Sequence, residues 1–235
     1  MQNKLLIIVP VLNEVNNIEP LLKRIFRYVN KNKDILFIND NSTDGTHQKI
    51  IEEKRRYKRI FLLNRIKKSG IGSAHKDALK WGFKRKYKYI ITMDCDGTHD
   101  PKYINKFLNL LKQNKYQIIS TNRFINTNSL DDWSLWRKKL TTLRHNLIKF
   151  LLNIDYDSSG AFRAYNVKMI ELKDIYLAKN DSYSFFWESM YILSKKYKIK
   201  EIPITLPGRL SGSSKMRITD IFLALFYLTK IFLTK

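Results

Sequence analysis

The chain has 235 residues, 44% of them hydrophobic and 13% aromatic, which supports a packed core and excludes wholesale disorder. The 44 Lys and Arg residues outnumber the 21 Asp and Glu residues and give a net charge of +23. Such a charge favours an anionic partner, such as nucleic acid, an acidic membrane face or a phosphorylated substrate. The alternative is that most of these cations are solvated side chains on the surface that bind no partner. The single cysteine, Cys95, excludes an internal disulfide or a cysteine-rich zinc site and fits a reducing compartment.

The apolar stretches of the sequence are short. The run before Pro10 is too short for a signal peptide, and no uncharged stretch reaches the roughly 18–20 residues that cross a bilayer. The sequence therefore predicts a soluble or peripheral protein, located in the cytoplasm and at the cytoplasmic face of the membrane.

Short apolar runs alternate with amphipathic segments in the first half of the chain. Continuous apolar runs predict buried strands at 5–9, 34–38, 60–63, 89–93 and 117–121. Helical periodicity predicts helices between them, at 18–29 with Asn16 or Asn17 as its cap, at 43–57, up to about Lys86, and from Pro101 onward. This alternation indicates an α/β fold, with helices on both faces of a mostly parallel sheet.

The second half loses this alternation. Helices are predicted at 133–152, 185–196 and 220–234, and strands at 159–165 and 199–205. No repeat or low-complexity linker separates the two halves. We therefore expect one domain over residues 1–217, followed by an apolar helix over 218–235 that either lies in a membrane interface or docks onto the sheet as core.

Polar residues follow four of the predicted strands, at 13–14, 39–45, 94–100 and 120–123. The carboxyl ends of parallel strands meet at one edge of a sheet, and ligands of open α/β sheets bind there. Asp94 and Asp96 stand one residue apart, so both side chains point to the same side and suit Mg²⁺ or Mn²⁺. The alternative is a turn in which one of them caps the next helix, a role that we assign to Asp100. Cys95 between them is expected to point into the core.

Several common motifs are missing. Gly70 and Gly72 are followed by His75 rather than by a third glycine, so the dinucleotide-binding fingerprint is absent. Lys67 and Lys68 either meet a phosphate at the start of the next helix or are solvated. The sequence has no phosphate-binding loop of the Walker type and no recognisable catalytic triad, and its four histidines lack metal-ligand spacing.

The motifs taken together resemble a known family. IVPVLNE (8–14), FINDNSTDGT (37–46), the glycine loop at 70–72 and MDCDGTHDP (93–101) resemble the GT-A glycosyltransferases of family 2. SSGAFRAY (158–165) and EIPITLPGRLSGSSK (201–215) narrow the resemblance to the dolichol-phosphate mannosyltransferase branch. The resemblance covers residues 5–220, with the motifs in order.

This resemblance implies an inverting transfer of a sugar from a nucleotide diphosphate to a polyprenyl or dolichyl phosphate. It favours GDP-mannose over a UDP-sugar as the donor, although the sequence determines neither the base nor the sugar. It implies Mg²⁺ or Mn²⁺ as the cofactor and a membrane surface that presents the acceptor. It implies no nucleic acid partner.

The resemblance also assigns residues. The nucleotide sugar is assigned to Pro10, Asn13, Glu14, Asp40, Gly70, Asp94 and Lys215, the metal to Asp94, Asp96 and Thr98, the acceptor phosphate to Arg123, Arg137 and Ser214, and the catalytic role to Asp96, Arg123 and Arg209. Two positions depart from the family pattern. Thr98 stands where members often have glutamine, and the segment before Arg163 has an added small residue, so that Arg163 is either displaced or structural.

The type of acceptor decides whether a protein base is required. A lipid phosphate is already anionic and attacks directly, whereas a hydroxyl needs a base, for which Glu188 is the candidate unless it is a helix-surface residue. Arg123, Arg137 and Arg209 favour a phosphate, because guanidinium groups bind phosphate oxygens well. The alternatives are a family 2 enzyme acting on a glycan hydroxyl in cell-surface polysaccharide synthesis and, on charge alone, a basic nucleic-acid-binding protein.

Overall fold

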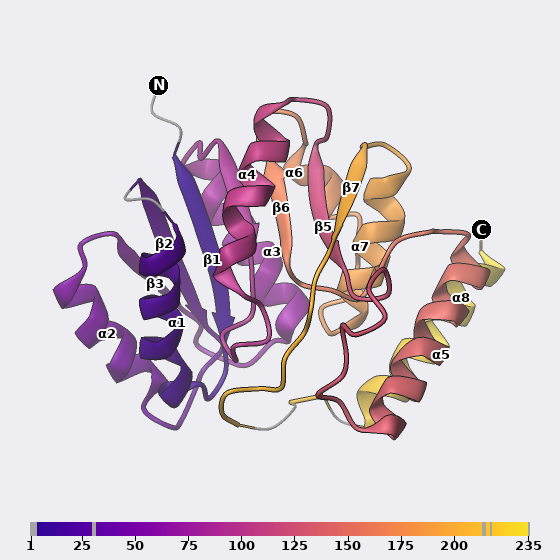
Figure 1. Cartoon of the computed structure of the whole chain (residues 1–235), viewed down its shortest axis with the longest axis horizontal. Helices are drawn as coiled ribbons and strands as arrows, with labels where there is room; N and C mark the ends of the chain where they lie inside the picture. The colour runs from indigo at the N-terminus through magenta and orange to yellow at the C-terminus, as the bar shows by residue number, and fades with distance from the viewer. Residues whose placement is uncertain (1–3, 30–31, 213–214, 217, 235) are drawn as a thin grey trace.

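The computed structural model of the chain describes residues 4–29, 32–212, 215–216 and 218–234. Seven strands of the described residues form one sheet in the order β3-β2-β1-β4-β6-β5-β7 (Figure 1). Their bounds are β1 (Leu5–Val11), β2 (Lys33–Asn39), β3 (Ile60–Asn64), β4 (Tyr89–Thr92), β5 (Ile118–Asn122), β6 (Arg163–Asn166) and β7 (Ile199–Pro203).

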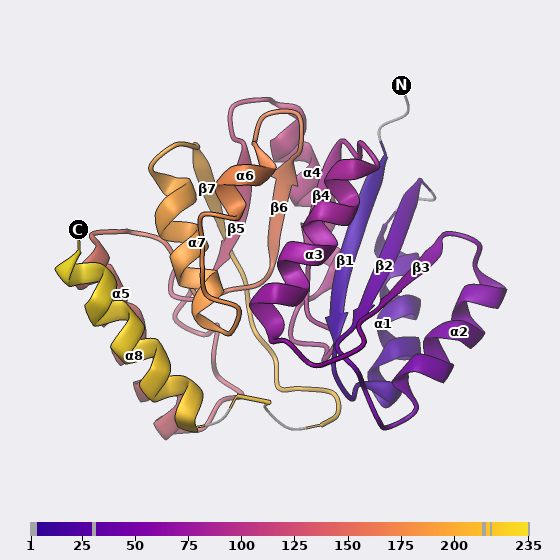
Figure 2. The same ribbon diagram turned by 180° about the vertical axis from the view of Figure 1, so that it is seen from behind.

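Helices cover both faces of this sheet. The helical segments are α1 (Val15–Tyr28), α2 (Thr46–Arg56), α3 (Ile71–Lys84), η1 (Pro101–Tyr103), α4 (Ile104–Lys112), α5 (Leu135–Leu152), α6 (Leu172–Ile175), α7 (Ser184–Ser194) and α8 (Ile218–Leu233). α1 and α4 lie on the face seen in Figure 1, and α3, α6 and α7 lie on the opposite face seen in Figure 2. The predicted α/β fold with helices on both faces is therefore confirmed.

The strands run parallel except for β6. β6 is antiparallel to β4 on one side and to β5 on the other, and its Ala164 pairs with Ile91 and Ile119. The remaining neighbours pair in parallel. The carboxyl ends of β1, β2, β4 and β5 therefore share one edge, as predicted, and β6 begins at that same edge.

Alternate side chains of β1 enter two separate cores. Ile7 and Val9 belong to the core beneath α1 and α4, while Leu6 and Ile8 belong to the core beneath α3 and α7. Burial on both faces explains why this strand is a continuous apolar run rather than an alternating one.

Pro10 does not end β1, which continues to Val11. The N–H of Met93 donates to the carbonyl of Ile8, so the even-numbered residues of β1 point their backbone groups toward β4. β4 pairs with β1 only as far as Ile8. A proline at position 10 therefore removes no hydrogen bond from the ladder and is tolerated inside the strand.

The predicted cap of the first helix is wrong. α1 begins at Val15, so that Asn16 and Asn17 lie inside its first turn. The N–H of Val15 donates instead to Oδ2 of Asp44, at 3.1 Å. The start of the helix is capped by a side chain distant in sequence, which a local pattern does not show.

α8 packs on α5 and α7 rather than on the sheet. Leu228 is buried among side chains of α5 and α7, and α5 and α8 lie side by side at one end of the molecule in both views (Figures 1 and 2). Many other apolar side chains of the two helices remain exposed. No helix in the described part of the chain has the length and apolarity needed to cross a membrane.

Arg163 is structural. Its side chain is 1% exposed, and its Nε donates to the carbonyl of Gly160 at 2.9 Å while Nη1 donates to Ser189 Oγ at 2.9 Å. Nη2 donates to the carbonyls of Ser158 and Phe186, at 2.8 and 2.6 Å. The guanidinium therefore ties the loop before β6 to α7, and its donors are not directed to a ligand.

We predict that Arg163→Met lowers the free energy of unfolding by about 3–5 kcal/mol, because three buried carbonyls each lose a hydrogen bond from the guanidinium. Urea denaturation measures the change. Arg55→Met, which removes an exposed cation from α2, is the control and should change stability by less than about 0.5 kcal/mol. A loss below about 1 kcal/mol for Arg163→Met would contradict the structural role.

Candidate active site

The ends of β1 and β2 are joined through Asn13. Its N–H donates to Ser42 Oγ at 2.9 Å, and its Oδ1 accepts from the N–H of Thr43 at 2.8 Å. The residue has a φ of 55°, a left-handed conformation that asparagine tolerates better than most residues. Pro10 is the last residue but one of β1, and Asn13 and Glu14 follow that strand. Three residues assigned to the nucleotide sugar therefore lie at the sheet edge.

Asp40 follows β2 and is buried against a cation that the sequence analysis missed. Its Oδ1 lies 3.0 Å from Nη1 of Arg65 and accepts from the N–H of Ser69 at 3.2 Å. Arg65 also donates to the carbonyl of Gly70, at 3.3 Å. A cation directly after a strand was the available signal, but only the pairing of β2 with β3 shows that it faces Asp40.

The glycine loop is shaped by protein contacts. Gly70 has a φ of +94°, and a Cβ there would lie 2.3 Å from the carbonyl oxygen of Asp181. That oxygen accepts the N–H groups of Gly72 and Ser73, at 2.9 and 3.2 Å. The first amides of α3 are therefore occupied, and Lys67 and Lys68 are exposed, which favours the solvated interpretation of these lysines.

A hollow of about 290 Å³ opens beside this group, at the ends of β2 and β3. It is lined by Asn39, Asn41, Ser42, Thr43, Gly45, His47, Gln48 and Asn64. Amide and hydroxyl groups dominate this lining, so the hollow offers hydrogen bonds to a polar ligand without adding charge.

Asp94 and Asp96 follow β4, with Cys95 buried in the core as expected. Asp96 Oδ1 accepts from the Oγ1 and the N–H of Thr98, at 2.6 and 3.1 Å. The backbone N–H of Asp94 donates to His99 Nδ1 at 2.8 Å. Thr98 therefore orients Asp96 directly, while its own hydroxyl proton is already donated.

The loop after β7 lies over this pair. Arg209 Nε is 3.2 Å from Oδ2 of Asp96, and the N–H of Leu210 donates to the Asp96 carbonyl at 2.9 Å. Gly97 leaves room for Leu210, because a Cβ there would lie 2.5 Å from its Cγ. Lys215 is near enough to Glu14 for its charge to lower the pKa of that carboxyl. Ser214 lies outside the described residues.

Burial and a neighbouring carboxylate raise the pKa of two carboxylates at this edge, in spite of the nearby cations. Removal from water raises the pKa of Asp94, against the charge of His99, and the charge of Asp96 raises it further. Burial likewise raises the pKa of Glu14, with a further contribution from Asp96. A bound divalent cation stabilises paired carboxylates, because its charge offsets the repulsion between them.

The donor set fits a cation shared with a ligand. No group of three or more His, Cys, Asp or Glu side chains that could hold a metal occurs among the described residues. Mg²⁺ is commonly held by one or two carboxylates together with substrate phosphates, rather than by a complete protein cage. Asp94 and Asp96 match that arrangement.

Arg123 at the end of β5 is fixed by a buried carboxylate. Its Nε and its backbone N–H both donate to Oδ2 of Asp157, at 2.7 and 3.1 Å. Although burial raises the pKa of Asp157, the charge and hydrogen bonds of Arg123 hold it below its usual range. The Asp157 N–H donates to Oε1 of Glu201 at 2.7 Å, and the side-chain amide of Asn122 donates to Oε2 of Glu201 at 2.8 Å. The sequence analysis did not find Asp157 or Glu201.

Arg137 extends from the first turn of α5 toward the same region. Its guanidinium lies 3.6 Å from the centre of the Trp133 ring. Burial lowers its pKa, and so do the charges of Arg209 and Arg123, while Asp96 raises it. Arg123, Arg137 and Arg209 therefore share one electrostatic neighbourhood with Asp96.

Glu188 is neither an exposed helix residue nor a free base. Its Oε1 accepts from the Lys179 N–H and the Tyr227 hydroxyl, at 2.8 and 2.7 Å. Its Oε2 accepts from the Asn180 N–H at 2.9 Å. The carboxylate is 3% exposed and holds a loop and α8 against α7.

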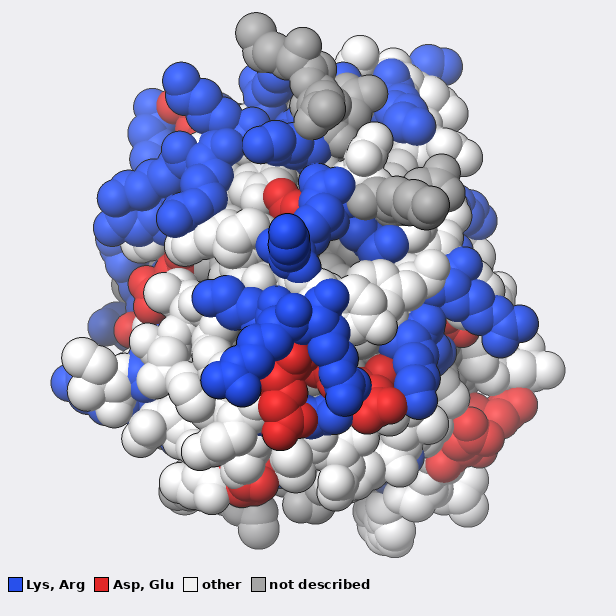
Figure 3. All heavy atoms as spheres, turned by 90° about the vertical axis from the view of Figure 1, so that its left-hand side faces the viewer, with Lys and Arg blue, Asp and Glu red and all other residues white. Residues whose placement is uncertain are grey.

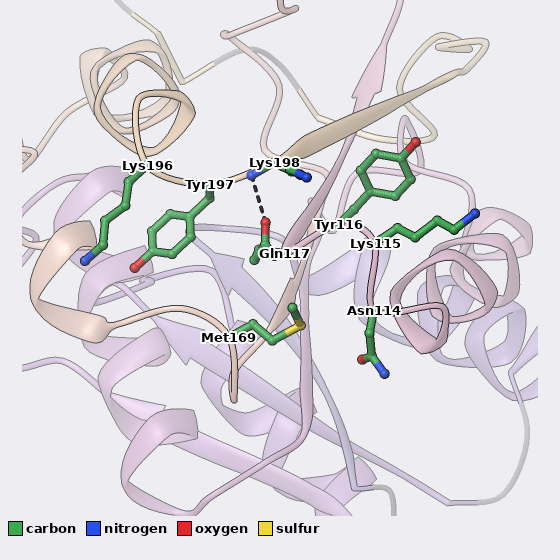
Figure 4. A pocket seen from close by; sticks show the side chains of 8 residues that line it. All are labelled: Asn114, Lys115, Tyr116, Gln117, Met169, Lys196, Tyr197 and Lys198. Atoms are coloured by element: carbon green, nitrogen blue, oxygen red, sulfur yellow. Dashed lines mark hydrogen bonds between the residues drawn. The ribbon is translucent and has the colours of Figure 1, made fainter.

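A second hollow, of about 640 Å³, lies away from this edge, where β5 and β7 begin (Figure 4). Its lining is Asn114, Lys115, Tyr116, Gln117, Met169, Lys196, Tyr197 and Lys198. The N–H of Lys198 donates to Gln117 Oε1 at 2.8 Å, and Lys196 is paired with Asp174 at 2.8 Å. None of the predicted site residues lies there.

The net charge is also spread beyond the candidate site. Lys and Arg side chains cover much of the face formed by α2 and β3, with scattered acidic residues (Figure 3). Exposed cations are dense at 54–59 and 84–86, just before β3 and β4 and so opposite the carboxyl edge. The value of +23 therefore does not by itself locate the site.

Comparison with known proteins identifies the family. The family model described as glycosyl transferase family 2 matches residues 6–172. The chain belongs to this family and is a glycosyltransferase.

The relatives it resembles include two enzymes with lipid-linked acceptors in their names. Polyprenol monophosphomannose synthase from Mycolicibacterium smegmatis is 27% identical over 224 residues, which span 94% of this chain and 84% of that protein. Undecaprenyl-phosphate mannosyltransferase from Micrococcus luteus is 26% identical over 215 residues, 91% of this chain and 87% of that protein.

A solved structure shares the fold. Glucosyl-3-phosphoglycerate synthase from Mycobacterium tuberculosis, in complex with Mn²⁺, UDP-glucose and phosphoglyceric acid, superposes with a TM-score of 0.69. It is 14% identical, and the match covers 99% of this chain and 79% of that one. The GT-A fold expected from the sequence is thereby confirmed.

Glu201 makes stability depend on pH. Burial raises its pKa from the ordinary 4.5 to about 7, so the folded protein retains this proton over a range in which the unfolded chain loses it. The associated stabilisation is complete below pH 4.5 and is lost as the pH rises to 7. We expect the stability difference between wild type and Glu201→Gln to change by on the order of 2 kcal/mol across this range. Urea denaturation at several pH values measures it, and equal slopes for both proteins would contradict the prediction.

Proposed function

We propose that the protein transfers mannose from a nucleotide diphosphate, GDP-mannose, to a polyprenyl phosphate at a membrane surface, with inversion. The observation that carries the proposal is that Arg209 pairs with Asp96, while Arg137 interacts electrostatically with Asp96, Arg209 and Arg123. Such a site can bind the donor diphosphate and a second phosphate together. The names of the two relatives support mannose and the lipid acceptor.

The donor is proposed to lie along the ends of β1, β2 and β4. Asn13, Glu14 and Asp40 offer hydrogen-bond acceptors for the nucleoside, beside the polar hollow at the ends of β2 and β3. Asp94 and Asp96 would hold Mg²⁺ or Mn²⁺, which supplies neutralisation of the leaving diphosphate. Arg209 and Lys215, on the loop over Asp96, would bind the donor phosphates from the other side.

The acceptor requires no protein base in this proposal. A phosphate monoester is anionic at neutral pH, so its oxygen can attack the sugar without losing a proton. Arg123 and Arg137 would orient it opposite the leaving group. Glu188 is occupied by two backbone N–H groups and Tyr227, which removes the base considered for a hydroxyl acceptor.

The α5–α8 pair is proposed to hold the protein at the membrane. Trp136, Leu140, Leu143 and Phe150 of α5 are exposed at positions that share one face of the helix. Phe222 and Phe226, one turn apart on α8, are 66% and 70% exposed. An apolar surface of this kind, flanked by lysines, can insert into the interface beside anionic headgroups.

We expect Asp94→Asn and Asp96→Asn each to lower metal-dependent mannose transfer by about 10²–10³-fold, because charge stabilisation of the leaving diphosphate is lost. The assay supplies GDP-mannose or UDP-glucose with a polyprenyl phosphate or a simple glycoside, in the presence of Mg²⁺ or Mn²⁺.

Asp131→Asn is the matched control, because Asp131 is an exposed carboxylate paired with Lys138. Undiminished turnover in both site variants would refute the site. Transfer to the glycoside and not to the lipid phosphate would refute the acceptor and favour a glycan hydroxyl.

We expect Phe222→Ser combined with Phe226→Ser to weaken binding to anionic phospholipid vesicles by about 10-fold or more, since each phenylalanine loses apolar burial in the interface. Vesicle co-sedimentation measures the partition. Leu177→Ser, which removes a 52% exposed apolar side chain outside α5 and α8, should leave it unchanged. If Leu177→Ser weakened vesicle binding as much as the double variant does, the result would contradict a specific membrane-binding surface on α8.

A further inference from the structure

Arg144 on α5 is a partly buried cation with no ion-pair partner among the described residues. Its Nε is buried and has no hydrogen-bond acceptor, and the described residues form no ion pair with its guanidinium. Removal from water, followed by the charge of Arg123, lowers the pKa of Arg144 to about 10. An unpaired charge in such a position destabilises the folded protein unless something else supplies the counter-charge.

Arg123 presents a second guanidinium to the same region, because the rings of Phe124 and His145, which follow Arg123 and Arg144 in the sequence, stack with their centres 4.0 Å apart. Asp157 occupies its Nε and its backbone N–H, and the terminal nitrogens have no acceptor among the described residues. Gly160 leaves Nη2 uncovered, because a Cβ there would approach this nitrogen to 3.3 Å. Asp157 therefore fixes the orientation of Arg123 while its outer nitrogens remain available.

The charges of Arg144, Arg123 and their acidic neighbours do not balance. Asp157 is the carboxylate whose charge acts on both Arg144 and Arg123. Glu201, which accepts the Asp157 N–H, has its pKa raised to about 7 and adds only part of a negative charge near neutral pH. Two guanidinium groups against one full carboxylate leave these described side chains with a net positive charge that suits an anion.

Arg137 lies in a different part of α5 from Arg144. It precedes Arg144 by two turns, or about 10 Å along the axis, and its electrostatic neighbours are Arg209, Asp96 and Arg123. Arg137 therefore interacts with Asp96 and Arg209 as well as with Arg123, whereas Arg144 interacts with the Arg123–Asp157 pair.

We propose that Arg144 and Arg123 together form a clamp for a phosphomonoester, and that this phosphomonoester is the headgroup of the acceptor. Guanidinium groups bind phosphate oxygens through paired hydrogen bonds that a lysine does not reproduce. The identification of the anion as the acceptor headgroup rests on the proposed function, whereas the anion site formed by Arg144 and Arg123 does not.

The test compares wild type with Arg144→Gln, Arg144→Lys and Lys149→Gln. Lys149 lies on the same helix, is paired with Asp155 at 2.7 Å and has no part in the clamp, so it controls for general loss of charge. One arm measures thermal stabilisation by inorganic phosphate, against chloride at equal ionic strength. The other measures the KM values for a short-chain polyprenyl phosphate and for the donor.

We expect Arg144→Gln to abolish the phosphate-dependent rise in Tm and to raise the KM for polyprenyl phosphate by about 10–100-fold, with the KM for the donor unchanged. Arg144→Lys should recover only part of both, and Lys149→Gln should match wild type. Without ligand, Arg144→Gln should be at least as stable as wild type, because an unpaired charge is removed.

The two arms separate the possible failures. If wild type fails to use polyprenyl phosphate but phosphate still stabilises it through Arg144, the clamp stands and the proposed acceptor fails. If lipid transfer occurs and Arg144→Gln leaves the acceptor KM and the phosphate response unchanged, the clamp is overturned. Lower stability of Arg144→Gln without ligand would also overturn it, because Arg144 would then be structural.

Discussion

The candidate site depends on the single antiparallel strand, β6. It lies between β4 and β5, so it separates Asp94 and Asp96 from Arg123 by two strand spacings, or about 10 Å. Because β6 runs in the opposite direction, its first residues lie at the edge where its neighbours end. The segment that enters β6 can therefore place Asp157 against Arg123. A parallel strand would have placed that segment at the other edge.

This arrangement gives the edge two electrostatic halves. On the β4 side, burial raises the pKa of Asp94 and of Glu14, and the charge of Asp96 raises both further. On the β5 side, burial lowers the pKa of Arg137 and of Arg144, and the charge of Arg123 lowers both further. Like charges therefore repel each other in each half. A divalent cation bound to the carboxylates, with phosphates between it and the arginines, would offset the repulsion in both halves. Folded proteins tolerate such local conflicts chiefly where a ligand resolves them.

The sequence predicts the parts of this edge that depend on local pattern. The buried strands and the polar residues after β1, β2, β4 and β5 can be recognised because burial on both faces requires continuous apolar runs. The pairs Asp40–Arg65 and Arg123–Asp157 cannot, since each joins segments brought together only by strand order. Arg144 carries no local signal that separates it from the other 43 Lys and Arg residues, because it differs from them in burial and in partners rather than in type or spacing.

α5 connects the proposed membrane contact with the proposed acceptor site. Leu143 faces solvent, while Arg144, next to it in the sequence, is half-buried toward Arg123. The two side chains leave the helix about 100° apart, since an α-helix has 3.6 residues per turn. A helix lying in the interface with its apolar face in the lipid would thus keep its arginines within a helix radius, about 5 Å, of the headgroup layer. A lipid phosphate can then reach these arginines while its hydrocarbon chain stays in the bilayer. In this arrangement the same helix would contact the membrane and bind the acceptor.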